Sequence, residues 1–204
     1  MKLIFAFVLT IVSFVQFSFA ANYVISIDGK EHEIDLGAPK VIDLGDGQNI
    51  TVVITQKEVV TYSTENFSFD HPSKLTPSRT DLGNGIYQNM VASPRGTLVL
   101  IQEYTSLDPS ALVDMMLNEL TKEEKKYGYK ITVSPSYKIL ADGKKLNGKS
   151  ATATYRSDEN IKNVLTFKGN DAGLLIVTQI DSSNFEVDTV LLETFWKSLT
   201  INMQ

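Results

Sequence analysis

Length, composition and charge already restrict what this chain can be. It has 204 residues, 43% of them hydrophobic and 21% charged, so we expect a folded domain with its own core rather than a disordered chain. The absence of cysteine excludes disulfide bonds, thiolate metal sites and a cysteine nucleophile. The two histidines, His32 and His71, are too few for a three-histidine metal site. A formal net charge of −5 disfavours nucleic acid or an anionic membrane as a partner.

Residues 1–20 have the pattern of a cleaved secretory signal peptide. Lys2 supplies a positive charge, and an almost wholly apolar stretch follows at residues 3–19. Ser18 and Ala20 place small residues three and one before a cut, which predicts cleavage after Ala20. The alternatives are an uncleaved anchor or a chance apolar stretch. We expect a periplasmic or secreted protein without a stable membrane anchor after cleavage.

Residues 21–62 predict an N-terminal β segment without helices. Residues 23–27 alternate and run into Asp28-Gly29, a two-residue hairpin signal. A second turn is expected at residues 45–47. Residues 49–56 and 58–62 are rich in valine, isoleucine and threonine, which favour strands.

Residues 63–204 predict a second, α+β part. Asp108-Pro109 is a typical helix start, and Leu112, Met116 and Leu120 then recur at helical spacing as far as the stop at Gly128. A C-terminal helix is expected over residues 187–199. The remaining apolar stretches predict strands, at residues 67–69, 86–92, 97–101, 129–133, 137–141, 150–156, 164–167 and 174–180.

Residues 143–150 match the G-x-x-x-x-G-K-S pattern of phosphate-binding loops, and the apolar stretch before Asp181 resembles a strand that carries a metal-binding acid. That chemistry requires a helix directly after Lys149, whose N–H groups face the phosphates. Ser150 instead begins an alternation that is typical of a strand. We therefore expect a lysine-bearing hairpin, closed by a turn at Asn147-Gly148, and no bound cofactor.

The histidines are the next candidates for chemistry. Asp70 precedes His71 and can orient its imidazole as a general base, but no G-x-S-x-G motif supplies a nucleophile. His32 lies between two glutamates that strand alternation places on the opposite face. We expect both histidines to be solvent-exposed, and we assign no catalytic residue.

Acidic turns raise the question of calcium, but their order does not follow that of a calcium-binding loop. We interpret them as plain turns and leave the presence of a metal site open. They comprise Asp43, Asp46 and Asn49; Asp158, Glu159 and Asn160; and Asn170 and Asp171.

Two apolar features each have two interpretations. Met115, Met116 and Leu120 form either a surface for a partner helix or part of the core, and the core is the commoner outcome. Trp196 is expected to anchor the C-terminal helix to the sheet.

Four short stretches of residues 63–203 resemble the PsbP-like superfamily, which includes the extrinsic photosystem II subunit and bacterial envelope proteins. The tryptophan usual after the opening proline is absent here, and Leu75 is the nearest candidate for its place. The similar stretches are NFSFDHP at 66–72, the single helix at 109–127, LNGKSA at 146–151 before a strand, and FWKSLTI at 195–201.

The resemblance implies an α/β/α sandwich around a mainly antiparallel sheet, to which residues 21–62 would add an extra β segment. It implies binding or assembly rather than catalysis. We therefore predict an exported, non-enzymatic bacterial envelope protein that binds a protein partner in an assembly, chaperone or immunity-type role. The alternatives are a carrier of a small ligand or calcium, and a secreted hydrolase that uses His71.

Overall fold

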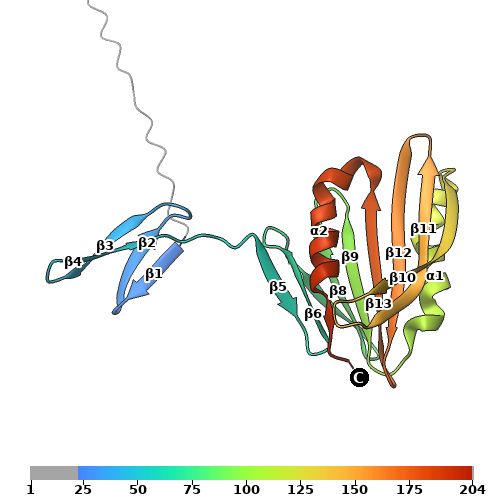
Figure 1. Ribbon diagram of the computed structural model, residues 1–204, viewed down its shortest axis with the longest axis horizontal. Helices are drawn as coiled ribbons and strands as arrows, with labels where there is room; N and C mark the ends of the chain where they lie inside the picture. Colours follow the sequence, from blue (N-terminus) through green and yellow to red (C-terminus); the bar gives the residue numbers. More distant parts are fainter. Residues whose placement is uncertain (1–22, 204) are drawn as a thin grey trace, which may run out of the picture. The chain divides into compact units, whose positions relative to one another are not determined.

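The computed structural model describes residues 23–203, without the side chains of residues 184–187 (Figure 1). These residues form two compact units, which divide between Gln56 and Lys57. The signal peptide expected at residues 1–20, with its cut after Ala20, lies outside the described residues.

The first unit consists of two β-hairpins. Strand β1 (Tyr23–Ile27) pairs with β2 (Lys30–Ile34), and β3 (Lys40–Gly45) pairs with β4 (Gln48–Val52). The connecting turns, Asp28-Gly29 and Asp46-Gly47, have positive φ at both residues, as tight hairpin turns with the right-handed strand twist require. The expected hairpin at Asp28-Gly29 is therefore confirmed.

The second unit begins earlier than the boundary expected between residues 62 and 63. Strand β5 (Val59–Ser63) pairs with β6 (Phe67–Pro72), with Val60 opposite His71. Residues 57–62, which we assigned to the N-terminal segment, thus belong to the larger unit. They contain most of β5, which is hydrogen-bonded to β6 of that unit.

A seven-stranded sheet forms the centre of the second unit, and all its neighbouring strands are antiparallel. A smaller sheet has the order β14-β6-β5, with β14 at Thr200–Ile201. The expected α+β class with a mainly antiparallel sheet is confirmed. The large sheet runs in the order β10 (Lys130–Ile139), β11 (Lys145–Tyr155), β12 (Asp158–Lys168), β13 (Gly173–Asp181), β9 (Leu98–Tyr104), β8 (Ile86–Ala92) and β7 (Ser78–Gly83).

The core lies on both faces of the large sheet, and strand β13 shows this most clearly. Leu174 and Ile176 belong to the apolar cluster that contains Phe195 of helix α2 (Phe185–Ser198). Leu175 and Val177 belong to the cluster of helix α1 (Val113–Lys126). Successive strand residues point to opposite faces, so the two helices cover opposite sides of the sheet (Figure 1). Neither described helix is long and apolar enough to cross a membrane.

Helix α1 buries a different row of residues from the one we expected. A 3-10 turn (Pro109–Leu112) comes first, with Asp108 accepting a hydrogen bond from the Ser110 amide. Val113, Leu117 and Thr121, each one position after a residue of the expected row, are the buried residues of the helix, and the two rows lie side by side on one broad face. The expected row, Leu112, Met116 and Leu120, packs at the edge of the same cluster.

Strand β10 is one continuous strand rather than the two expected at residues 129–133 and 137–141. Pro135 lies in its middle, opposite Lys149 of β11. Proline has no N–H to donate to a neighbouring strand. It is tolerated here because β10 is at the edge of the sheet and has a partner strand on one side only.

The turn expected at Asn147-Gly148 is wrong, since both residues lie inside β11. The hairpin closes at Asp142-Gly143, a dipeptide that is itself typical of a turn, where Gly143 has φ +84°. Gly148 serves another purpose: a Cβ there would overlap the carbonyl oxygen of Val164 and lie 2.9 Å from the Cα of Leu165. The backbones of β11 and β12 therefore lie closer together at Gly148 than a residue with a Cβ atom would allow.

We predict that Gly148→Ala destabilises the second unit by about 3 kcal/mol, because the added methyl must push β12 away from β11. Urea denaturation measures this difference. Lys149→Ala, one residue further along the strand, is the matched control and should change stability by less than about 1 kcal/mol, since it removes only an exposed ion pair. Equal effects of the two substitutions would contradict the close approach.

We also predict a pH-dependent contribution from Asp108. Hydrogen bonds from Ser110 and the ammonium of Lys168, 3.0 Å away, lower the pKa of Asp108 to about 2. A lowered pKa in the folded state adds stability above the ordinary value of 3.8, and this is lost as the pH falls towards 2. Asp108→Asn should therefore lower the melting temperature at pH 6 and have a smaller effect at pH 2.5. A constant difference would contradict the assignment.

Candidate functional site

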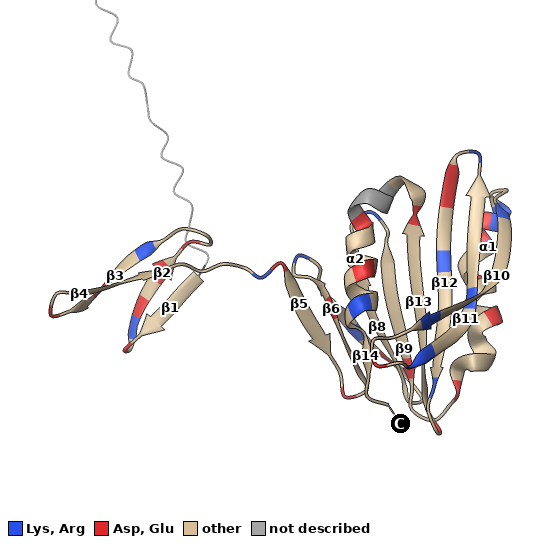
Figure 2. Cartoon of the chain, viewed as in Figure 1, with Lys and Arg blue, Asp and Glu red and all other residues tan. Residues whose placement is uncertain are grey.

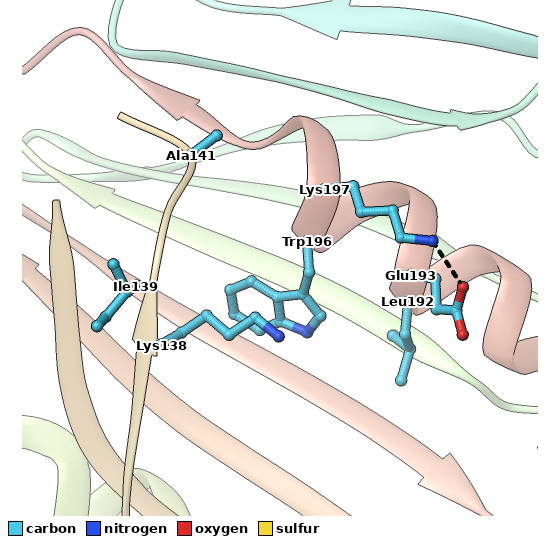
Figure 3. A pocket seen from close by; sticks show the side chains of 7 residues that line it. All are labelled: Lys138, Ile139, Ala141, Leu192, Glu193, Trp196 and Lys197. Atoms are coloured by element: carbon cyan, nitrogen blue, oxygen red, sulfur yellow. Dashed lines mark hydrogen bonds and ion pairs between the residues drawn. The ribbon is translucent and has the colours of Figure 1, made fainter. Parts of the chain in front are cut away.

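A groove of about 470 Å³ lies between helix α2 and the end of strand β10 (Figure 3). Its walls combine apolar side chains with lysines at the rim. Strand β10 and the loop after it supply Lys138, Ile139 and Ala141, and α2 supplies Leu192, Glu193, Trp196 and Lys197.

The helical repeat explains which residues α2 presents to the groove. Leu192 and Trp196 are four residues apart and so lie on one face of the helix. Phe195 points into the core, and its ring centroid is 4.7 Å from that of Trp196 in an edge-on arrangement. Trp196 thus packs against the core, as expected of an anchor, and also lines the groove.

Charged groups border the indole on two sides. The ammonium nitrogen of Lys138 lies 5.4 Å from the centroid of the Trp196 ring, a cation–π distance. Lys197 forms an ion pair of 2.9 Å with Glu193, one helical turn earlier (Figure 3). The groove therefore has an aromatic wall with cations at its rim.

An exposed apolar row lies on the same edge strand, on the side of the sheet that α1 covers and opposite the side of Lys138 and Trp196. Val133, Tyr137 and Ile139 are 51%, 64% and 60% exposed, and their odd numbering places them on one face of β10. Ile139 belongs to both the row and the groove. Large apolar side chains gathered on one strand of a surface are typical of an interaction site.

The hairpin that carries this row is strongly basic. Residues 130–149 contain five lysines and one acidic residue, in a chain whose formal net charge is −5. Figure 2 shows the lysine positions on β10 and β11 in blue. Lys144 pairs with Asp142 and Lys149 with Asp114. Lys138 and Lys145 instead lie against aromatic rings, those of Trp196 and Tyr137.

A second polar cluster is centred on Glu103, which is fully buried. One carboxylate oxygen lies 3.0 Å from Arg79 and accepts a hydrogen bond from Asn89, and the other accepts one from Asn66. Asn89 also accepts a hydrogen bond from the hydroxyl of Tyr62, whose pKa is raised by burial. Both Glu103 oxygens are thus bonded, and the cluster joins the smaller sheet to β7, β8 and β9.

Our sequence analysis did not find the Glu103 cluster. Its members are distant in the chain, and Asn66 lies in the turn between β5 and β6, outside the strands that carry the others. A buried carboxylate without hydrogen-bond donors would cost folding free energy. Because Glu103 has donors from several elements, we interpret the cluster first as a structural link between those elements. The hollow beside it, about 490 Å³, is lined in part by the same residues.

The expectation that His71 is exposed is wrong. His71 is buried because it follows Phe67 and Phe69 on the inward face of β6, where its ring packs edge-on against Phe69. Its Nδ1 lies 3.0 Å from the carbonyl oxygen of Pro72. Asp70 faces the other way and accepts a hydrogen bond from Thr61, so Asp70 and His71 do not form an acid–base pair.

His32 is half-buried on β2, opposite Ile25, so it is also less exposed than expected. Ser150, the end of the phosphate-loop pattern, lies within the extended strand β11. Lys149 is followed directly by more of this strand and not by a helix, so the arrangement that a phosphate-binding loop needs is missing there.

The acidic turns do not come together as a metal site. Among the described residues there is no group of three or more histidine and carboxylate side chains placed to hold an ion. Asp43 accepts a hydrogen bond from the Gly45 amide, as a turn residue does. Asp158, Glu159 and Asn160 are not a turn, because they begin strand β12 directly after a turn that contains Arg156 with positive φ.

No protein-family model matches this chain, and the search of curated proteins gives no significant match.

Proposed function

We propose that this is an exported, non-enzymatic bacterial envelope protein that binds a protein partner, and that the groove beside Trp196 is the contact surface. The role is of the assembly, chaperone or immunity type. Export rests on the signal-peptide pattern of residues 1–20, with periplasmic or secreted location after cleavage.

The observation that carries this proposal is the groove itself, whose indole wall stands beside the exposed side chain of Ile139. Protein-binding surfaces concentrate tryptophan and tyrosine at their centre, surrounded by polar groups. Trp196 and Leu192 supply the apolar wall of the groove, and Ile139 lines it from strand β10. Lys138 and Lys197 supply the polar rim.

We further propose that the second unit is a PsbP-like α/β/α sandwich. The antiparallel sheet with α1 and α2 on opposite faces supports this, as do strand β6 at the NFSFDHP stretch and helix α2 with strand β14 at FWKSLTI. The LNGKSA stretch departs from the pattern, since it lies inside a strand and not at a turn. Leu75, in the place of the missing tryptophan, packs against the core.

A small-ligand carrier is the second candidate. The groove volume of about 470 Å³ lies within the range of small-molecule sites, and one wall is an indole ring. The calcium form of this hypothesis lacks a cluster of ligands among the described residues. The hydrolase hypothesis has no support from the surroundings of His71, whose neighbouring carboxylate faces away.

The test is affinity capture of the exported, tagged chain from the envelope of its native host. We predict a stoichiometric protein partner with the wild type. The double substitution Lys138→Ser and Ile139→Ser, at two residues that line the groove, should reduce its recovery at least about tenfold, because the central residues of a contact surface each contribute more than about 1 kcal/mol. Met115→Ser is the matched control: Met115 is 61% exposed but lies outside the groove, so recovery should not change.

Equal recovery with the wild type and the double variant would remove the groove from the proposal. Repeated capture of no protein, together with turnover of a small substrate, would overturn the binding function itself.

A further inference from the structure

We infer that a second pocket of the larger unit, beside the N-terminal part of α2, binds a small aliphatic primary amine, with Asp188 as the group that recognises the ammonium. The described residues that line this pocket are all different from those of the groove beside Trp196, so the inference does not rest on the proposed function. Three observations carry it: a buried carboxylate with one unbonded oxygen, apolar walls around it, and a rim that does not suit a peptide.

The pocket has a volume of about 420 Å³, which lies within the range of small-molecule sites. It lies where α2 passes the end of β6, the loop after β6, and the turn between β8 and β9. Each of these segments contributes apolar side chains to its walls. The apolar lining residues are Pro72, Leu75, Pro94, Val190 and Leu191.

Asp188 is the acidic residue that lines this pocket, and it is 6% exposed. Its Oδ2 accepts a hydrogen bond of 2.6 Å from the hydroxyl of Ser93. Its Oδ1 accepts no hydrogen bond from the residues that the structure describes, and none of their cations forms an ion pair with this carboxylate. Because a buried carboxylate is costly without a counter-charge, the pocket favours a ligand with a positive charge.

Ser93 holds the carboxylate in place and has no capacity left for a ligand. Its single proton goes to Asp188, and its oxygen accepts hydrogen bonds from the amides of Arg95 and Thr97, at 3.2 Å each. The turn between β8 and β9 thus fixes the carboxylate from one side. Oδ1 is the remaining acceptor, at which an ammonium group binds by a charge-assisted hydrogen bond.

The walls determine what is attached to the ammonium group. An alkyl chain buries its apolar surface against them. A polyamine is disfavoured, because its second ammonium would meet either the apolar walls or the ammonium of Lys74, an exposed residue that also lines the pocket. A lysine within a peptide is disfavoured because Pro72 and Pro94 have no N–H to donate to a peptide carbonyl. A free amine with one charge and a short alkyl chain fits best.

The experiment uses the isotope-labelled, exported full chain and four small probes. Hexylamine has both the charge and the alkyl chain, hexanol lacks the charge, hexanoate reverses it, and methylamine lacks the chain. In two-dimensional NMR titrations, hexylamine should shift the amide signals of Leu75, Ser93 and Leu191. Each of the other probes should bind at least about tenfold more weakly. Equal affinity for hexanol and hexylamine would show an apolar pocket without charge recognition and would overturn the inference.

Two variants with the same change of charge test the position of the ligand. Asp188→Asn keeps the shape of the side chain and the acceptor for Ser93. It should weaken hexylamine binding at least about tenfold and leave hexanol binding nearly unchanged. Asp114→Asn, in the first turn of α1, is the matched control and should change neither. Equal hexylamine affinity of the two variants would contradict the role of Asp188.

Lys74 provides a test of opposite sign. Lys74→Ala removes a like charge from the pocket and should strengthen hexylamine binding, more at low than at high salt. Weaker binding by this variant would contradict the selection of a cation. If a peptide with one central lysine binds more tightly than hexylamine, the occupant is a polypeptide and the inference is wrong.

Discussion

The structure depends on the burial of strand β13 from both sides. Leu174, Leu175, Ile176 and Val177 are consecutive and fully buried, so alternate side chains need cover on opposite faces of the sheet. Burial of each such side chain contributes about 1.5–3 kcal/mol. Helix α1 covers one face and α2, with the smaller sheet, covers the other. The position of α2 then brings Trp196 beside the end of β10, where the groove forms.

Local patterns predicted much of this fold. The turn at Asp28-Gly29, the strand that contains residues 174–180 and the approximate places of both helices followed from signals within a few residues of each other. The failures came from contacts distant in the sequence. Gly148 is required by the backbone of Val164, and a glycine after asparagine looks the same as a turn when that neighbour is unknown. His71 is buried because β6 packs under α2, where the amide of Asp70 donates to Ser198.

The candidate site was predictable only in its parts. The sequence indicated that Trp196 anchors the last helix and that the hairpin around residue 145 bears lysines. It placed the possible partner surface at Met115, Met116 and Leu120, of which two pack at the core. The groove joins Lys138 and Trp196, 58 positions apart, and no local periodicity connects them. Such a surface becomes visible only when the strand order is known.

The most direct test of the account is site-specific cross-linking in the native envelope. A photoreactive benzoylphenylalanine replaces Ile139 in one variant and Met115 in another, since both positions are about equally exposed, at 60% and 61%. The account predicts one defined protein adduct from position 139, and none from position 115. An adduct from position 115 alone, or the same adducts from both, would contradict the groove beside Trp196 as the binding surface.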